Sequence, residues 1–383
     1  MLTLAGILCF SIWLYLLLFH GGFWRLRPIV APSPEPGTTA ARVVVVIPAR
    51  NEAAVVGQCV SSLLRQAGGH SIQIILVDDA SSDGTAEVAR DAAQAAGKSA
   101  SLTVIEGRAL EPGWSGKLWA VEQGVERARQ YDPEFILLTD ADIEHASESV
   151  STLVAIARNG VYDLVSCMVR LHCQTFAERA LIPAFVFFFF QLYPPAWIAD
   201  PRLKMAGAAG GSILIRPEAL SRAGGIAAIR GEVIDDCALA RRVKDSGGKI
   251  WLGLASTTRS IRPYGTFAEI GRMISRGAFN QLKHSAAMLL LALVGLTITY
   301  LLPPALVFSH RWTPALLGAA SWLLMIVCFL PTVRFYRLSP LWAPALPLIA
   351  IFYMAASVHS AFKYWSGRGG EWKGRIQDPA RIN

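Results

Sequence analysis

The hydrophobic and polar positions divide the chain into apolar ends and a middle part of ordinary soluble character. Residues 2–19 carry no charge and are long enough to cross a bilayer as a helix. Three further apolar stretches, 286–308, 314–333 and 343–362, lie near the other end. Roughly residues 40–265 have the mixture of a soluble domain. The pattern predicts a soluble domain between an N-terminal anchor and a C-terminal membrane region.

The charges around the apolar segments predict their orientation. Residues 2–19 lack the basic start and small-residue cleavage site of a secretory signal, so we expect a retained anchor. Arg25, Arg27 and Arg42 follow it, and the positive-inside rule therefore places the soluble domain in the cytoplasm. Three C-terminal spans would leave the basic tail outside, against the same rule. The sequence leaves two or three spans open.

In the middle part, short apolar runs rich in β-branched residues alternate with helical patterns. The runs are residues 43–47, 72–77, 101–105 and 135–139. The helical patterns are residues 52–66, 85–96 and 117–129. Continuous apolar runs are typical of buried parallel strands, and their alternation with helices predicts a doubly wound α/β sheet. In such sheets ligands bind beyond the carboxyl ends of the strands.

Polar clusters begin where three of the runs stop. They are "PARNE" (48–52), "DDASSDGT" (78–85) and "DAD" (140–142). The first run is not followed by GxGxxG, which disfavours an ordinary dinucleotide site, and GxxxxGK[ST] does not occur, which excludes a P-loop.

The "DAD" cluster is a candidate metal site. Asp140 and Asp142 are two residues apart, so both side chains face the same way in an extended chain. Two carboxylates on one face suit Mg²⁺ or Mn²⁺, which would also bind diphosphate oxygens. A turn rich in aspartate is the alternative.

A second acidic pair, Asp235 and Asp236, lies within a predicted helix in "GEVIDDCALARRV" (231–243). At 100° per residue, Asp236 shares a stripe with Val233, Ala240 and Val243, whereas Asp235 leans toward the charged side. A half-buried carboxylate has a raised pKa, which suits a general base. We therefore assign the base to Asp236 and its support to Asp235; a solvated helix face is the alternative.

"GWSGKLWA" (113–120) places glycines before a helix with Lys117 in its first turn. Free backbone N–H groups and a cation suit an anionic ligand. A solvated lysine in a loop is the alternative.

Residues 180–199 form another apolar stretch, "ALIPAFVFFFFQLYPPAWIA". Pro183, Pro194 and Pro195 are expected to break a helix here, and a span would put "DAD" and "IDD" on opposite sides of the membrane. We expect an interfacial element lining the site of a lipid acceptor. A hydrophobic core helix is the alternative.

Composition agrees with a membrane protein. Of the 383 residues, 53% are hydrophobic and 17% are charged, and the net charge is +8. Positive charge fits cytoplasmic loops and anionic headgroups. No basic stripe with interleaved aromatics supports binding of nucleic acid. The six cysteines form no CxxC pair and are expected to be reduced.

Six motifs in order resemble the family 2 glycosyltransferases, inverting enzymes with a GT-A fold. They are "VVVVIPARNE", "ILVDDASSDGT", "GKLWAVEQG", "LLTDAD", "GAAGGSILIRPEAL" and "IDDCALARRV". The resemblance covers about residues 43–282. "PARNE", the phenylalanine-rich stretch, "GGSILIRPEAL" and "GRGGEWKGR" are most similar to the hopanoid-biosynthesis-associated glycosyltransferases, and distantly to ceramide glucosyltransferase.

The resemblance implies a role for each cluster, with the base at the second position of the acidic pair. The residues implied to bind the nucleotide-sugar are Pro48, Ala49, Arg50, Asn51, Glu52, Asp78, Asp79, Lys117, Asp140 and Ala141. The residues implied for the metal are Asp140 and Asp142, and those for the sugar and acceptor are Gly210, Gly211, Ser212 and Arg276. Asp83 is expected to be structural, as a helix cap.

The chain departs from the family at the QxxRW motif. Residues 271–282, "GRMISRGAFNQL", have Arg272, Arg276 and Gln281 but no Arg-Trp pair. Arg276 would meet the diphosphate, or would belong to a basic interfacial helix without a catalytic part. The full motif accompanies processive polymerases, so its loss favours transfer of a single sugar.

The sequence thus predicts a glycosyltransferase of a bacterial inner membrane with a cytoplasmic catalytic domain. It would move one sugar from a nucleotide-diphosphate donor, by family a UDP-sugar, to the hydroxyl of a lipid such as a hopanoid or a ceramide-like lipid. A processive polysaccharide synthase, a polyprenyl-phosphate sugar transferase and an inactive membrane scaffold are the alternatives. The expected parts are an anchor (1–24), a linker (25–42), the GT-A domain (43–265), an amphipathic interfacial helix (266–285), the C-terminal membrane region (286–363) and a basic tail (364–383).

Overall fold

The computed structural model describes residues 1–26, 28–29, 39–367, 371–372 and 375–376. Arg27, most of the expected linker and most of the basic tail therefore lie outside the described residues. The chain forms two compact units. The first comprises Met1–Leu26, Cys173–Trp197 and Pro263–Gly370, and the second Arg27–His172, Ile198–Arg262 and Glu371–Asn383. Cys173–Trp197 thus belongs with the terminal helices and interrupts the stretch 43–265.

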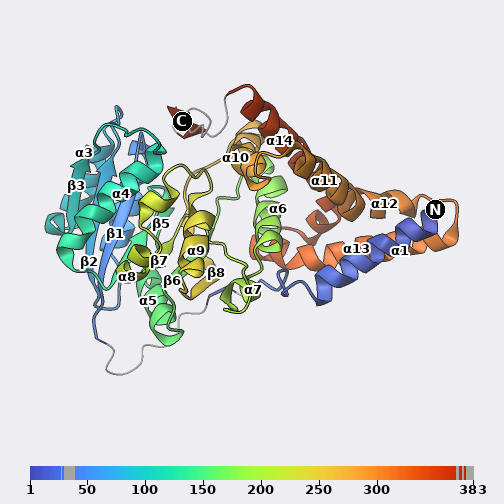
Figure 1. Cartoon of the computed structure of the whole chain (residues 1–383), viewed down its shortest axis with the longest axis horizontal. Coiled ribbons are helices and arrows are strands. Elements are labelled where there is room, and N and C mark those ends of the chain that lie inside the picture. The colour runs from blue at the N-terminus through green and yellow to red at the C-terminus, as the bar shows by residue number, and fades with distance from the viewer. Residues whose placement is uncertain (27, 30–38, 368–370, 373–374, 377–383) are drawn as a thin grey trace. The chain divides into compact units, whose positions relative to one another are not determined.

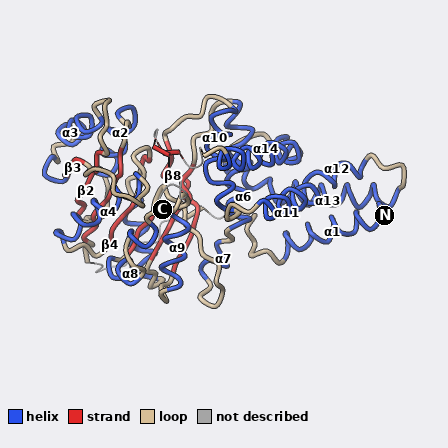
Figure 2. The backbone as a smooth tube through the Cα atoms, turned by 45° about the horizontal axis from the view of Figure 1, so that its top comes forward, coloured by secondary structure: helices blue, strands red, loops and turns tan. Residues whose placement is uncertain are grey.

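The second unit is built on one eight-stranded mixed sheet, seen edge to edge in Figure 2. Its strands are β1 (Arg42–Ala49), β2 (Ser71–Asp78), β3 (Leu102–Glu106), β4 (Phe135–Leu138), β5 (Ile143–Glu144), β6 (Leu164–Arg170), β7 (Ile213–Ile215) and β8 (Ile250–Ser260). Their order is β3-β2-β1-β4-β7-β6-β8-β5. The first four are parallel to one another, β7 is antiparallel to β4 and β6, and β5 is antiparallel to β8. The four predicted strands are confirmed, but the sheet is mixed rather than wholly parallel.

Helices cover both faces of the parallel part, which explains the continuous apolar runs. Side chains of a strand alternate between faces. Val43, Val45 and Ile47 belong to the core formed with α2 (Ala53–Leu64), α3 (Thr85–Ala95) and α5 (Ser149–Asn159). The other face meets α4 (Gly116–Ala128), where a Cβ on Gly124 would lie 2.3 Å from Val46 (Figure 1). Glycine therefore lets α4 approach the sheet closely.

Short elements complete this unit. They are η1 (Ser99–Ser101), η2 (Arg129–Tyr131), α8 (Pro217–Arg222), η3 (Ile226–Ile229), α9 (Asp235–Asp245) and a pair of strands, β9 (Glu371–Trp372) and β10 (Arg375–Ile376). α7 (Pro195–Ala199) lies where the chain passes from one unit to the other.

The first unit is helical. Its elements are α1 (Leu2–Leu18), α6 (Phe176–Leu192), α10 (Phe267–Gln281), α11 (Ala286–Leu296), the π-turn η4 (Thr297–Leu301), α12 (Leu302–Val307), α13 (Trp312–Phe335), η5 (Pro340–Ala345) and α14 (Leu346–Trp365). Four helical segments of the described chain are long and apolar enough to cross a membrane: Phe176–Ala199, Ala286–Val307, Trp312–Phe335 and Pro340–Trp365. α1 is apolar but shorter, with 17 residues.

The expectation that Pro183 breaks the apolar stretch is wrong. α6 runs through Pro183 and ends only at Leu192, before the Pro194–Pro195 pair. A capping box of Thr175 and Glu178 fixes its start, and packing holds the rest: Phe187 lies 5.3 Å from Phe23 between ring centres. Interior proline costs helix stability, and tertiary packing outweighs that cost here.

A proline pair explains how α1 is attached. Pro303 and Pro304 have no N–H, so in the i→i−5 pattern of the preceding π-turn the carbonyls of Ile298 and Thr299 lose their partners. Both carbonyls accept from α1, Thr299 from the Trp13 Nε1–H at 2.7 Å and Ile298 from the Cys9 thiol at 3.3 Å. α1 thus satisfies backbone groups that an apolar environment would leave unpaired.

All six cysteines are free, as expected for reduced thiols.

Candidate functional site

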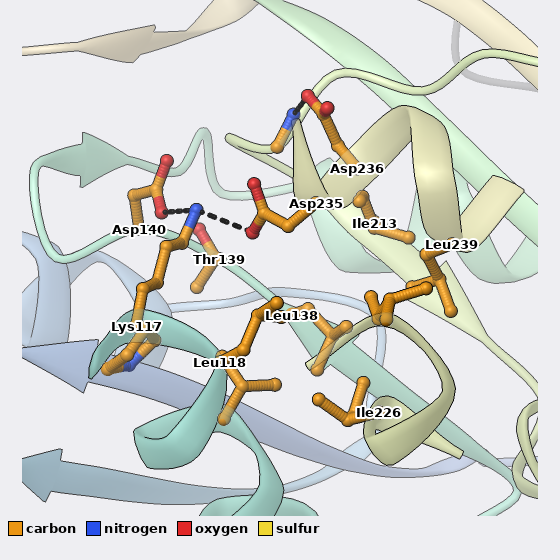
Figure 3. Close-up of a pocket in the computed structure, with 14 residues that line it drawn as sticks. Lys117, Leu118, Leu138, Thr139, Asp140, Ile213, Ile226, Asp235, Asp236 and Leu239 are labelled. Carbon is orange, nitrogen blue, oxygen red and sulfur yellow. Dashed lines mark hydrogen bonds and ion pairs between the residues drawn. The ribbon is translucent and has the colours of Figure 1, made fainter. Parts of the chain in front are cut away.

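A pocket opens at the carboxyl ends of β1 and β4 in the second unit (Figure 3). Its polar side chains are Lys117, Thr139, Asp140, Asp235 and Asp236. The remaining lining is mostly apolar: Pro48, Leu118, Val121, Leu138, Gly210, Ile213, Ile226, Ile229 and Leu239. Three separate motifs thus bring four residues with predicted functional roles into one pocket: Lys117, Asp140, Asp235 and Asp236.

Lys117 lies at the centre of the polar side of the pocket. Its Nζ is 2.9 Å from Asp140 Oδ1 and 3.1 Å from Asp235 Oδ2. Ser115 caps the start of α4 by accepting from the Leu118 N–H, which fixes the turn that carries Lys117. Burial alone would lower the pKa of Lys117, but the two carboxylates outweigh burial and raise that pKa. Lys117 is therefore a permanent cation between two carboxylates.

The acidic pair lies at the start of a helix, not in its interior as the sequence suggested. α9 begins at Asp235, so both carboxylates occupy the first turn, where the helix dipole favours negative charge. Asp236 accepts from two backbone amides, that of Gly210 to Oδ2 at 2.8 Å and that of Cys237 to Oδ1 at 2.7 Å. Asp235 turns instead to Lys117.

Asp236 has the environment of a base. Burial raises its pKa to about 6, and the neighbouring charge of Asp235 adds to the rise. Lys117 and the two amide bonds oppose it. The two members of the pair differ in their contacts: Asp235 forms an ion pair with Lys117, and Asp236 accepts hydrogen bonds from the backbone amides of Gly210 and Cys237.

The structure separates the two aspartates of "DAD". Asp140 pairs with Lys117, whereas Asp142 Oδ2 accepts from Arg262 Nε at 2.7 Å. Arg262 also binds Glu52, at 2.7 Å to Oε1 and 2.5 Å to Oε2. Burial would lower the pKa of Arg262, and the charges of Asp142 and Glu52 raise it. Sequence reasoning missed Arg262, whose only signal was its place just after a long strand.

The loop after β1 and the loop after β2 are joined to each other by hydrogen bonds. Arg50 donates to the Asp79 carbonyl at 2.5 Å, and its guanidinium lies 3.6 Å from the buried Asp79 carboxylate. The Asn51 side chain accepts from the Ser82 N–H at 2.9 Å, with Asn51 in the left-handed region at φ 52°. Asp83 accepts from the Ala53 and Thr85 amides and so ties together the starts of α2 and α3. "PARNE" and "DDASSDGT" therefore form one platform.

The remaining expected residues differ in their access to the pocket. Pro48 and Gly210 line it. Ala49, Asp79, Ala141 and Ser212 are buried. Asp78 accepts from the Ser81 amide, and Gly211 packs on Val169. Arg276 is exposed on α10 of the helical unit and is not part of this pocket.

Within the described residues, no group of three or more His, Cys, Asp or Glu side chains is arranged to hold a metal ion. Asp140 and Asp142 offer one carboxylate each, both now paired with a cation of the protein. Such a pair still suits Mg²⁺ or Mn²⁺, because these ions keep waters and take further oxygens from phosphates.

Comparison with known families decides the nature of the domain. Residues 44–234 match the model of glycosyl transferase family 2. The chain carries a family 2 glycosyltransferase domain. The matched range contains most of β1, all of β2 to β7, Lys117 and Asp140, and ends just before Asp235. The protein is therefore a glycosyltransferase, and the predicted family 2 domain is confirmed for this part of the chain.

One solved structure supports the fold of this glycosyltransferase. A mannosyltransferase, PcManGT from Pyrobaculum calidifontis, solved with GDP-Man and Mn²⁺, is 19% identical over 95% of this chain and 99% of its own, with a TM-score of 0.59. S. aureus TarS 1-349, solved with UDP-GlcNAc, is 14% identical over 87% of this chain and 95% of its own, with a TM-score of 0.39. The first likeness agrees with a GT-A-like mixed α/β sheet.

Proposed function

We propose that this protein is a membrane-bound inverting glycosyltransferase that moves a single sugar from a nucleotide-diphosphate donor to the hydroxyl of a lipid. The observation that carries the proposal is the meeting of Lys117, Asp140, Asp235 and Asp236 in one pocket at the strand ends of a family 2 domain. This arrangement provides a cation, a carboxylate for a metal ion and a carboxylate with a raised pKa within one cavity.

Asp236 acts as the base in this proposal. It removes the proton of the acceptor hydroxyl, whose oxygen then attacks the anomeric carbon while the bond from that carbon to the diphosphate breaks. Direct displacement inverts the anomeric configuration. Asp235 holds Lys117 in place, and the Lys117 ammonium provides positive charge where the diphosphate leaves.

Asp140 and Asp142 are the residues proposed to hold a divalent cation, which when bound would stabilise the negative charge of the leaving diphosphate. Holding it requires both carboxylates to share or release their present partners, Lys117 and Arg262. The platform of "PARNE" and Asp79 is proposed to bind the nucleotide.

The apolar helices support a lipid acceptor. Four described helical segments are apolar and long enough to cross a membrane, and α6 carries four consecutive phenylalanines. A lipid held beside such helices keeps its chains out of water while its hydroxyl remains at the polar boundary. A hopanoid or a ceramide-like lipid remains the specific proposal, and a bacterial inner membrane the proposed location.

Two donor classes are candidates. The family favours a UDP-sugar, whereas the similarity over 95% of the chain to a mannosyltransferase solved with GDP-Man makes GDP-mannose the second candidate. A screen of both classes with the same acceptor separates them.

The proposal is tested with purified protein in detergent, radiolabelled UDP- and GDP-sugars, Mn²⁺ or Mg²⁺, and a hopanoid extract. A labelled lipid that depends on the metal is the expected result, and no labelled lipid with any donor contradicts the proposal. A product on polyprenyl phosphate that survives Asp236→Asn would instead identify a polyprenyl-phosphate sugar transferase, because that acceptor is already ionised. Mass spectrometry of lipids from cells with and without the protein identifies the native product.

A further inference from the structure

Thr139, the residue before Asp140, is a buried hydroxyl between two separate parts of the site. Its side chain is 2% exposed. Its Oγ1 donates to the carbonyl of Gly211 at 2.8 Å and lies 3.0 Å from Nε2 of His145. A hydroxyl has one proton, and Gly211 takes it, so the Thr139 oxygen must accept from the His145 ring.

These contacts assign the tautomer of His145. Burial lowers the pKa of His145 to about 4, so the ring is neutral and carries one N–H. That proton lies on Nε2, where it faces Thr139, and Nδ1 lies 3.4 Å from the hydroxyl of Ser149. The backbone N–H of His145 is held by Ser62 Oγ at 3.0 Å. His145 is thus fixed at both its ring and its backbone.

The loop that Thr139 holds also binds Asp236. Gly211 follows Gly210, whose N–H donates to Asp236 Oδ2 at 2.8 Å (Figure 3). On its other side the loop is gripped by the buried Ser166, which bonds both the N–H and the carbonyl of Ala209, at 2.8 and 3.1 Å. Hydrogen bonds to buried hydroxyls thus fix two adjacent glycines that would otherwise be free to turn.

We propose that His145 and Thr139 are positioning residues that, through the Gly211 carbonyl, aim the Gly210 amide at Asp236. The inference rests on the proposed role of Asp236 as the base. His145 is buried, and Thr139, although it lines the pocket, is 2% exposed and its hydroxyl is bonded to Gly211 and His145, so both are proposed to act through the loop. His145 orients the Thr139 hydroxyl, and Thr139 fixes the peptide between Gly211 and Ser212. The N–H of that peptide, on Ser212, donates to the Ala209 carbonyl at 3.4 Å, and the peptide between Ala209 and Gly210 carries the amide that stabilises the ionised carboxylate.

The charged groups around Asp236 show why this amide matters. Asp235 on the same helix raises the pKa of Asp236, and Lys117 on α4 lowers it. Asp140, at the end of β4, shares Lys117 with Asp235. Lys117 is thus shared between Asp140 and Asp235, and backbone amides provide the remaining stabilisation of the Asp236 carboxylate.

The test compares Thr139→Val, which keeps the shape and removes the hydroxyl, with Thr139→Ser, which keeps the hydroxyl. Thr258→Val is the matched control, because Thr258 is also buried in the same unit and, among the described residues, its hydroxyl accepts a hydrogen bond from the Ala146 amide at 3.5 Å, far from the 207–212 loop in the chain. Two readouts are used on the full-length protein in detergent: hydrogen–deuterium exchange of the peptide that contains residues 207–212, and the dependence of kcat on pH.

Thr139→Val should speed exchange at Gly210, lower kcat about tenfold with donor KM nearly unchanged, and move the acidic limb of the profile to higher pH. Thr139→Ser and Thr258→Val should behave as the unmodified protein, and His145→Gln, which keeps an N–H near Nε2, should retain more activity than His145→Leu. A Thr139→Val protein with unchanged exchange, or with a lower kcat but an unmoved acidic limb, overturns the inference. An active Asp236→Asn protein would overturn the proposed base, and the exchange result would still report on the loop.

Discussion

At the scale of single residues, the adjacent aspartates Asp235 and Asp236 have different partners and should respond differently to the same substitution. Asp236→Asn removes the proposed base, so sugar transfer should fall at least about a thousandfold, while donor affinity should change little. Asp235→Asn removes one of two carboxylates from Lys117 and should weaken donor binding, with a smaller loss of transfer. Steady-state kinetics with donor titration measures both, and the reverse order of damage would exchange the two roles.

The protonation of Asp236 predicts the pH dependence of transfer. Its pKa is raised from an ordinary 3.8 to about 6 by burial, so the carboxylate is ionised and competent as a base only above about pH 6. The rate should fall about tenfold per pH unit below that value. Since the folded protein holds this proton more tightly than the unfolded chain, the contribution to stability is greatest below pH 3.8 and declines as the pH rises to about 6. A kcat–pH profile without a limb near pH 6 would contradict the assignment.

The sequence distinguished Asp236 from Asp235, but by a different physical route from the one in the structure. A helical wheel gave the two residues different faces of the helix. In the structure both lie in the first turn, and they differ because Asp235 pairs with Lys117, which lies 118 residues earlier in the chain. The partners Lys117, Thr139 and Arg262 come from distant segments, and no spacing rule within one segment reveals such contacts.

At the scale of elements, Arg262 joins the end of β8 to the loops after β1 and β4. Arg262→Gln leaves Glu52 and Asp142 facing each other without a cation and should destabilise the unit by about 2 kcal/mol, less than for a fully buried pair because Arg262 is 31% exposed. Thermal unfolding with and without nucleotide measures the effect. Arg259→Gln, which breaks the more exposed pair with Glu144, is the control and should cost under about 0.5 kcal/mol. Equal losses of stability for Arg262→Gln and Arg259→Gln would show that Arg262 contributes no more to stability than an exposed ion pair.

The attachment of α1 to the proline-containing turn gives a second prediction for elements. Trp13→Phe removes the donor to the Thr299 carbonyl and should destabilise the helical unit by about 1–2 kcal/mol. Pro304→Ala returns an N–H to this turn. In a protein that carries Pro304→Ala, Trp13→Phe should therefore destabilise the helical unit less. A double-mutant cycle of detergent unfolding measures the difference, and a cost that is unchanged by Pro304→Ala would contradict this account.

Long elements with strong patterns were predictable, and short or proline-containing elements were not. The runs at 43–47 and 72–77 became β1 and β2 because strands buried on both faces are apolar throughout. β7 has three residues and β5 has two, too few for any period to appear, and β7 is the strand that makes the sheet mixed. α6 continues through Pro183 because packing on other helices outweighs the local preference.

At the scale of the whole molecule, neither unit is a continuous stretch of chain. A shortened chain of residues 40–265 would retain α6 without α13 and α14, whose Phe329 and Tyr353 lie 5.2 and 4.8 Å from Phe187 and Phe188 between ring centres. It should aggregate without detergent, because those phenylalanines become exposed. Replacing residues 173–197 in it by a short Gly/Ser linker should restore solubility. Size-exclusion chromatography compares the two, and a soluble monomer that still contains α6 would contradict the grouping of the units.

The same interruption has a consequence for the order in which the protein is made. The ribosome completes β1 to β6 first, then α6, and only afterwards β7 and β8, which the sheet needs in the middle and near one edge. α6 must then wait for α13 and α14, which emerge more than a hundred residues later. For that interval Phe187 and Phe188 lack their later partners Phe329 and Tyr353, and a chaperone or the lipid itself must shield them. During synthesis the chain is thus most prone to aggregate through α6, the segment that later joins the helical unit.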